Sequence, residues 1–144
     1  MYRPPAIIRY EQLYFASFAL GLIATAVTWQ ARAASIARHP MLADAPWIGP
    51  AVLVFSITIS LTLWYFTARA PSVVAKWVVV AFAAVSAGGM AFTAMSLIAG
   101  RVPAAQALLS IAVSALYVAA ATLLFRAEAR LWFGESSDAE DEDA

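Results

Sequence analysis

Four long stretches of the chain carry no charged side chain: residues 12–31, 45–68, 77–100 and 102–125. An α-helix rises about 1.5 Å per residue, so about 20 residues cross the roughly 30 Å hydrocarbon layer of a membrane, and each stretch is long enough for one crossing. Because lipid offers no hydrogen-bond partner to the backbone, each crossing is expected to be helical. The sequence therefore predicts an all-α integral membrane bundle of four transmembrane helices.

The composition agrees with a membrane protein. Of the 144 residues, 63% are hydrophobic and 12% are charged, whereas soluble domains average about 45–50% apolar and about 25% charged residues. Such a chain has too few polar side chains to cover a soluble surface. The composition also excludes a disordered chain and a nucleic-acid-binding protein, and the absence of cysteine excludes a disulfide-stabilised secreted domain.

Prolines, glycines and capping residues divide the chain into helices. The expected helices cover residues 7–34, 47–68, 73–99 and 103–133, within one membrane domain of residues 1–134. Asp44 and Ser72 are candidate N-caps for the second and third helices, and Gly100 and Gly134 close the third and fourth. The fourth helix is longer than the hydrocarbon layer, so its last turns are expected to emerge at the lipid surface.

The basic residues indicate which side of the membrane holds the termini. Four crossings place both termini on one side. That side carries Arg3, Arg9, Arg69, Lys76, Arg126 and Arg130, and the other carries Arg32, Arg38 and Arg101. Because Lys and Arg near helix ends favour the cytoplasm, both termini are expected on the cytoplasmic side.

A cleaved signal peptide is an alternative interpretation of the first apolar stretch. Arg3 and Arg9 could form its basic region, and Ala31-Arg32-Ala33 resembles a cleavage site. The long apolar run and the early Glu11 argue against cleavage. Cleavage would leave three helices and separate the termini.

Small residues at helical spacing mark candidate helix contacts, because apolar helices in lipid associate where small side chains allow close approach. The pairs are Ser17 and Gly21 on the first helix, Ala84 and Gly88 on the third, and Ser110 and Ser114 on the fourth. Packing within the bundle is the simpler interpretation. A dimer face or a polar path is the alternative.

Hydroxyl groups follow two stripes of the second helix. Ser56 and Ser60 form one stripe, and Thr58 and Thr62 form the other. Tyr117 places a further hydroxyl near the middle of the fourth helix. We expect it to hydrogen-bond across the bundle to a hydroxyl of the second helix, or to a backbone carbonyl.

Residues for familiar catalytic and metal chemistry are scarce. His39 is the only histidine and the chain has no cysteine, which excludes a bis-histidine haem site, a zinc site and an iron–sulfur site. No charged residue lies in the middle of a span, where proton-coupled transporters usually carry one. We therefore expect no catalytic residue, no cofactor, no metal and no enzymatic activity.

Charged residues gather instead at the expected cytoplasmic ends of the helices. This inner-face charge cluster comprises Arg3, Glu11, Arg69, Lys76, Glu128 and Arg130. Opposite charges at converging helix ends can pair and fix the bundle, and each exposed pair contributes only about 0–1 kcal/mol. A binding site for lipid headgroups is the alternative interpretation of the cluster.

Residues 135–144 contain six of the nine acidic side chains and no basic one. Such a run of like charges is expected to form a disordered acidic tail. Docking to a basic partner, or to the basic inner face of the protein itself, is the functional interpretation. A tail that is merely solvated is the simpler one.

Three segments together carry a resemblance to known sequences. They are Arg3-Pro4-x-x-Ile7-x-x-Tyr10-Glu11-x-Leu13-Tyr14, Ala68-Arg69-x-x-Ser72-x-Val74-Ala75-Lys76-Trp77 and Leu123-Leu124-Phe125-x-x-Glu128-Ala129-Arg130-x-Trp132-Phe133. The chain resembles a group of small, uncharacterised four-helix inner-membrane proteins of bacteria. The resemblance covers nearly the whole chain except the acidic tail. It implies a multi-pass protein of the bacterial inner membrane and brings no activity with it.

These observations lead to two hypotheses about function. The first is a non-enzymatic membrane protein that acts through protein or lipid contacts, as an accessory or assembly subunit. Its partners would be the lipid bilayer and a second copy or another membrane protein, and not nucleic acid. The alternative is a small transporter or channel with a path along the Ser and Thr stripes and Tyr117, gated by Glu11.

Overall fold

The computed structural model describes residues 3–38 and 45–135, and these form five helices. The helices are α1 (Pro5–Ala37), α2 (Ile48–Ala68), α3 (Val73–Ile98), α4 (Ala104–Leu123) and the short α5 (Ala127–Trp132). The first four are long and apolar enough to cross a membrane. The described residues thus contain the four expected apolar helices.

Local sequence signals account for several helix ends. Proline is tolerated where a helix begins, and Pro4 is the N-cap of α1 with Pro5 as its first residue. The Ser72 side chain caps α3 by accepting a hydrogen bond from the Ala75 backbone N–H at 3.3 Å, as expected. Gly100 follows α3 with a φ of +65°, a conformation that glycine adopts without strain. The expected cap Asp44 lies outside the described residues.

The expected continuous helix over residues 103–133 is wrong. α4 ends at Leu123, the chain turns through an extended Arg126, and α5 begins at Ala127. The turn lays α5 against the end of the bundle, where Ala129 and Phe133 are buried. A straight helix would carry these side chains away from the other helices, so their burial favours the turn.

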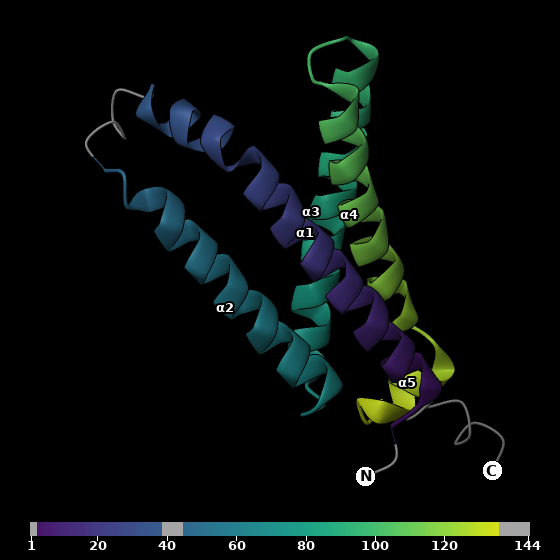
Figure 1. Ribbon diagram of the computed structural model, residues 1–144. Coiled ribbons are helices and arrows are strands. Elements are labelled where there is room, and N and C mark those ends of the chain that lie inside the picture. The colour runs from purple at the N-terminus through teal and green to yellow at the C-terminus, as the bar shows by residue number, and fades with distance from the viewer. Residues whose placement is uncertain (1–2, 39–44, 136–144) are drawn as a thin grey trace, which may run out of the picture.

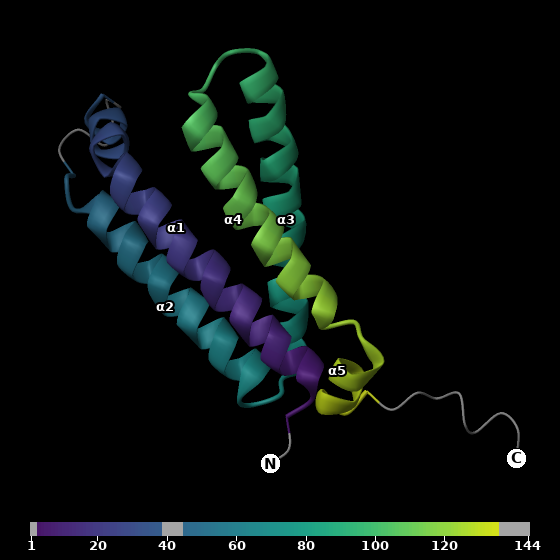
Figure 2. The ribbon, with the colours of Figure 1, turned by 45° about the vertical axis from the view of Figure 1, so that its right-hand side comes forward.

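The helices form two hairpins that meet at one end and diverge at the other. In both Figure 1 and Figure 2, α1 and α2 run side by side, α3 and α4 run side by side, and the two pairs separate away from α5. We call the end formed by residues 3–14, 64–79 and 120–135 the base. We call the opposite end, formed by residues 29–37, 46–53 and 95–107, the open end.

The buried core lies mostly at the base. Ile7, Tyr10, Val79 and Leu124 are among its largest fully buried side chains. Small side chains of α4, such as Ala120, allow α1 to approach α4 closely there. Burial of apolar surface against small residues therefore joins the two hairpins at this end.

The candidate packing residues divide into those that face a neighbouring helix and those that do not. Ser17 is buried and donates a hydrogen bond to the Val113 carbonyl at 2.9 Å, and a Cβ added at Gly21 would lie 3.7 Å from a Val113 methyl group. This stripe of α1 therefore faces α4. Ser114 is half-buried, whereas Ser110 is exposed on the surface of α4.

The stripe expected on α3 points away from the bundle. Ala84 and Gly88 are exposed, and a Cβ added at Gly88 would meet nothing within 4 Å. The buried face of α3 instead carries Val79 and Ala83. Alanine occurs on every face of this helix, so its spacing alone did not identify the packed one.

Candidate functional site

Glu11 is the centre of an ion-pair network at the base. Its Oε2 lies 3.0 Å from Arg3 Nη1, and its Oε1 lies 3.3 Å from Arg69 Nη2. The same Oε1 accepts a hydrogen bond from the Trp64 indole N–H at 3.1 Å. One carboxylate therefore connects the segment before α1, α1 itself and the end of α2.

Trp64 holds this network in place through its ring as well as its N–H. The Arg69 guanidinium carbon lies 5.5 Å from the centroid of the Trp64 ring, which is cation–π distance. The ring also packs against Phe15, with centroids 5.1 Å apart. Stacking on a fixed indole limits the rotamers of Arg69, so the pair with Glu11 loses less side-chain entropy than a free surface pair.

A second network surrounds Lys76, near the start of α3. Its side chain is only 3% exposed, and its Nζ lies 2.6 Å from Glu135 Oε2. The rings of Phe125 and Phe133 flank the ammonium group at 5.3 and 5.4 Å. A buried cation is costly without a partner, and the positive end of the α3 dipole adds to that cost. Glu135 and the two rings together compensate it.

α5 is fastened to the rest of the base by further polar contacts. Trp132 donates its indole N–H to the Thr67 carbonyl of α2 at 3.2 Å. Arg130 Nε lies 3.8 Å from the Glu135 oxygen that also binds Lys76. The chain after α4 therefore clips onto both α2 and α3. We call residues 126–135 the C-terminal clip.

The structure divides the inner-face charge cluster into two groups. Arg3, Glu11 and Arg69 form the first, and Lys76 and Arg130 meet on Glu135 in the second. Glu128 is exposed and forms no ion pair within the described part of the chain.

Two residues of these networks were missed from the sequence. Glu135 had been assigned to the acidic tail, whose residues 136–144 lie outside the described residues. The signal that could have identified Glu135 is the need of Lys76 for a carboxylate partner. Trp64 was not among the candidate site residues identified from the sequence.

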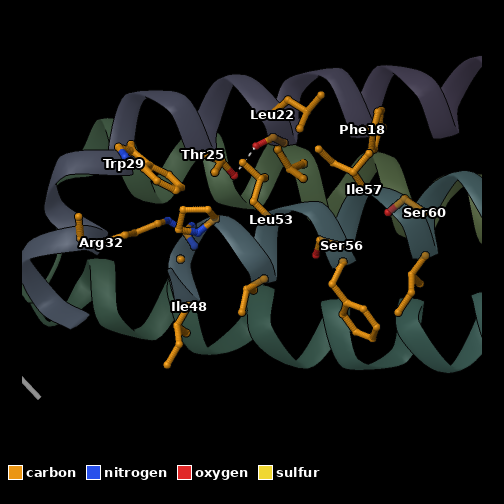
Figure 3. Close-up of a pocket in the computed structure, with 18 of the residues that line it drawn as sticks. Phe18, Leu22, Thr25, Trp29, Arg32, Ile48, Leu53, Ser56, Ile57 and Ser60 are labelled. Carbon is orange, nitrogen blue, oxygen red and sulfur yellow. Dashed lines mark hydrogen bonds between the residues drawn. The ribbon is translucent and has the colours of Figure 1, made fainter. Parts of the chain in front are cut away.

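A cleft of about 910 Å³ lies between the hairpins and extends to the open end. Figure 3 shows Trp29, Arg32 and Ile48 near one end of it, with Phe18 and Ser60 toward the other. Exposed large apolar side chains, including Phe55 and Phe82, belong to its lining. The cleft is therefore largely apolar and accessible from the surface of the molecule.

Some polar groups of the cleft are hydrogen-bonded within the fold, and others are not. The Tyr14 hydroxyl donates to the Ser60 carbonyl at 2.8 Å, and Thr25 donates to the Gly21 carbonyl at 2.9 Å. The Ser56 and Ser86 hydroxyls also line the cleft, and they form no hydrogen bond with any described residue. Such hydroxyls are available to a molecule in the cleft.

The two hydroxyl stripes of α2 have different surroundings. Ser56 and Ser60 line the cleft, as does Tyr117. Thr58 and Thr62 donate back to the Val54 and Thr58 carbonyls of their own helix. The cross-bundle hydrogen bond that was expected from Tyr117 to a hydroxyl of α2 is made instead by Tyr14, to a backbone carbonyl.

Arg32 is the only charged side chain in the lining of the cleft, among the described residues. Its Nε donates to Thr28 Oγ1 at 2.9 Å, and Thr28 donates in turn to the Ala24 carbonyl at 2.8 Å. These bonds hold the arginine along α1 at the open end. Within residues 3–38 and 45–135, no group of three or more His, Asp or Glu side chains could hold a metal ion, and His39 lies outside them.

Comparisons with protein-family models, with curated proteins and with solved structures find no match to this chain. Its function must therefore be inferred from the geometry of the base and the cleft.

Proposed function

We propose that this is a non-enzymatic protein of the bacterial inner membrane that acts by holding a membrane lipid in its cleft. The observation that carries the proposal is the cleft itself, which is apolar and bordered by exposed aromatic side chains. Its volume of about 910 Å³ falls within the roughly 300–1,000 Å³ typical of sites for small ligands. In a bilayer, lipid is the molecule that surrounds such an opening at the highest concentration.

The ion pairs of the base support a structural role for the inner-face charge cluster. Both oxygens of Glu11 are bound within the fold, and the Lys76 ammonium group is enclosed by Glu135 and two aromatic rings. These groups are therefore already paired: the Glu11 network ties α1 to the end of α2, and the Lys76 pair ties α3 to the C-terminal clip. This leaves the cleft as the part of the described chain best suited to an external molecule.

The experiment is to purify the protein in a mild detergent and to measure co-purifying lipid by native mass spectrometry. Ser56→Phe places a ring in the cleft without breaking a hydrogen bond found among the described residues, so it is expected to abolish lipid retention. Ser110→Phe is the matched control, because Ser110 is exposed on α4 away from the cleft. Equal lipid retention by the two variants would refute the proposal.

The proposed orientation places the base in the cytoplasm. The base carries Arg3, Arg69, Lys76 and Arg130, whereas the open end carries fewer basic residues. Because the chain has no cysteine, a single Glu128→Cys variant can be compared with Gln106→Cys. A membrane-impermeant thiol reagent added to intact spheroplasts is expected to label position 106 and not position 128. The reverse pattern would overturn the orientation.

A small transporter is the second candidate, supported by the presence of Ser56, Ser60 and Tyr117 in one cleft. In this mechanism the Glu11 network would be the gate at the base. Flux of a cation or a lipophilic drug into proteoliposomes should then be lost in Glu11→Gln and kept in Glu128→Gln. Absence of flux in the unmodified protein would remove this candidate.

A further inference from the structure

We infer that the cleft selects a phospholipid with an anionic headgroup, bound with its phosphate at Arg32 and an acyl chain directed toward Tyr14. This inference rests on the proposed function and deepens it, because it names the class of lipid and its direction. The starting observation is the single positive charge that the described lining residues place in the cleft.

The position of Arg32 along α1 matches the level of a lipid headgroup. Glu11 and Arg32 are 21 residues apart in one helix, which corresponds to about 31 Å along its axis. This is close to the roughly 30 Å thickness of the hydrocarbon layer. With the Glu11 network at one surface, Arg32 therefore reaches the opposite one. Trp29, whose indole is of the type enriched at membrane interfaces, lines the cleft at the same end.

The chemistry of Arg32 suits a phosphate. Thr28 accepts a hydrogen bond from Nε, so the side chain is already oriented, and its two Nη groups make no hydrogen bond to a described residue. A planar guanidinium binds phosphate through parallel N–H donors, which gives both affinity and direction. No acidic side chain belongs to the described lining of the cleft, so an anionic group meets no repulsion from within it.

The length and the apolar lining of the cleft suit an acyl chain. Tyr14 and Arg32 both line the cleft and are 18 residues apart on α1. This separation corresponds to about 27 Å along the helix axis. The cleft offers about 910 Å³. A flexible chain fits this space, and its length lies along the apolar wall formed by residues such as Leu22 and Leu53.

The test is a competition between two lipids in nanodiscs that contain equal amounts of phosphatidylglycerol and phosphatidylcholine. Native mass spectrometry of the released protein measures which lipid is retained. The unmodified protein is expected to prefer phosphatidylglycerol by about tenfold, the size of one charge-assisted hydrogen bond. Arg32→Gln is expected to remove the preference by lowering phosphatidylglycerol retention more than phosphatidylcholine retention, because the choline cation already offsets the phosphate charge of phosphatidylcholine. Arg32→Lys is expected to keep part of the preference.

Arg38→Gln is the matched control, because Arg38 caps the same helix and does not line the cleft. An equal loss of preference in Arg38→Gln and Arg32→Gln would assign the effect to general surface charge and overturn the inference. An unchanged preference in Arg32→Gln would also overturn it, and would leave lipid binding in the cleft intact. The proposed function fails separately, if Ser56→Phe retains both lipids as the unmodified protein does. If the unmodified protein is a dimer and only Ser56→Phe separates it into monomers, a second copy of the chain occupies the cleft. That result would overturn both the proposed function and this inference.

Discussion

The base and the open end are built from the same four long helices and are held in different ways. At the base, Trp132 donates a hydrogen bond across the hairpins to the Thr67 carbonyl of α2, and the pair of Lys76 and Glu135 ties the C-terminal clip to α3. Toward the open end, threonines such as Thr25 and Thr28 bond back to their own helix. A hydroxyl satisfied within its own helix does not hold a neighbour, so the hairpins are joined at the base and at the contact of Ser17 with Val113, and they separate toward the open end. The cleft is the consequence of this difference.

The largest expected effect comes from breaking the C-terminal clip. Glu135→Ala removes the partner of a lysine whose side chain is 3% exposed. Loss of one member of a buried ion pair costs about 3–5 kcal/mol, and we expect about 3 kcal/mol because Glu135 itself is 25% exposed. Unfolding by sodium dodecyl sulfate from detergent micelles measures the change. The exposed Glu128→Ala should have almost no effect, and equal losses in the two variants would show that the clip does not stabilise the base.

A smaller loss is expected at the other network of the base. Glu11→Gln weakens the contacts to Arg3 and Arg69 and keeps an acceptor for Trp64. Both arginines are partly exposed, at 33% and 45%, so each pair is expected to contribute no more than about 1 kcal/mol. The same unfolding assay should show a loss of about 1–2 kcal/mol, which high salt reduces. A loss as large as that of Glu135→Ala would make this network, and not the clip, the stronger connection.

The smallest expected effect has the opposite sign. Gly88→Ala replaces an exposed glycine inside α3 at a position where a Cβ would meet nothing within 4 Å. Because glycine weakens a helix interior relative to alanine, stability should rise by about 0.5–1 kcal/mol. A fall in stability accompanied by a change in oligomeric state would show that this face packs closely against a second copy. The contrast between a joined base and an open end would then depend on that second copy as well.

The sequence predicted the four apolar helices well because a long apolar segment without charge is stable in few surroundings other than lipid. It also brought Arg3, Glu11 and Arg69 into one cluster, since opposite charges at converging helix ends are expected to pair. It failed at the turn before α5, because no proline or glycine interrupts residues 123–133 and the surface that receives Phe133 is formed by other helices. Tertiary packing decided that turn, and no local signal encodes it.

The cleft was equally hidden from sequence reasoning. Ser56 and Ser60 follow the same spacing whether they face another helix or an opening, and the spacing of Ala84 and Gly88 suggested a contact that their exposed face does not make. Small residues permit close approach without requiring it. Whether two helices do pack closely depends on the specific bonds between them, and these lie mostly at the base.

The ion pair between Lys76 and Glu135 also affects how the protein is made. Its members are 59 residues apart in the chain. At about 5–20 residues per second, roughly 3–12 seconds of synthesis separate them. During this interval α3 carries a lysine that has no partner for its buried position. The base can close only after Glu135 has left the ribosome. A prematurely ended chain therefore exposes an unpaired lysine and an incomplete base to the proteases of the cell.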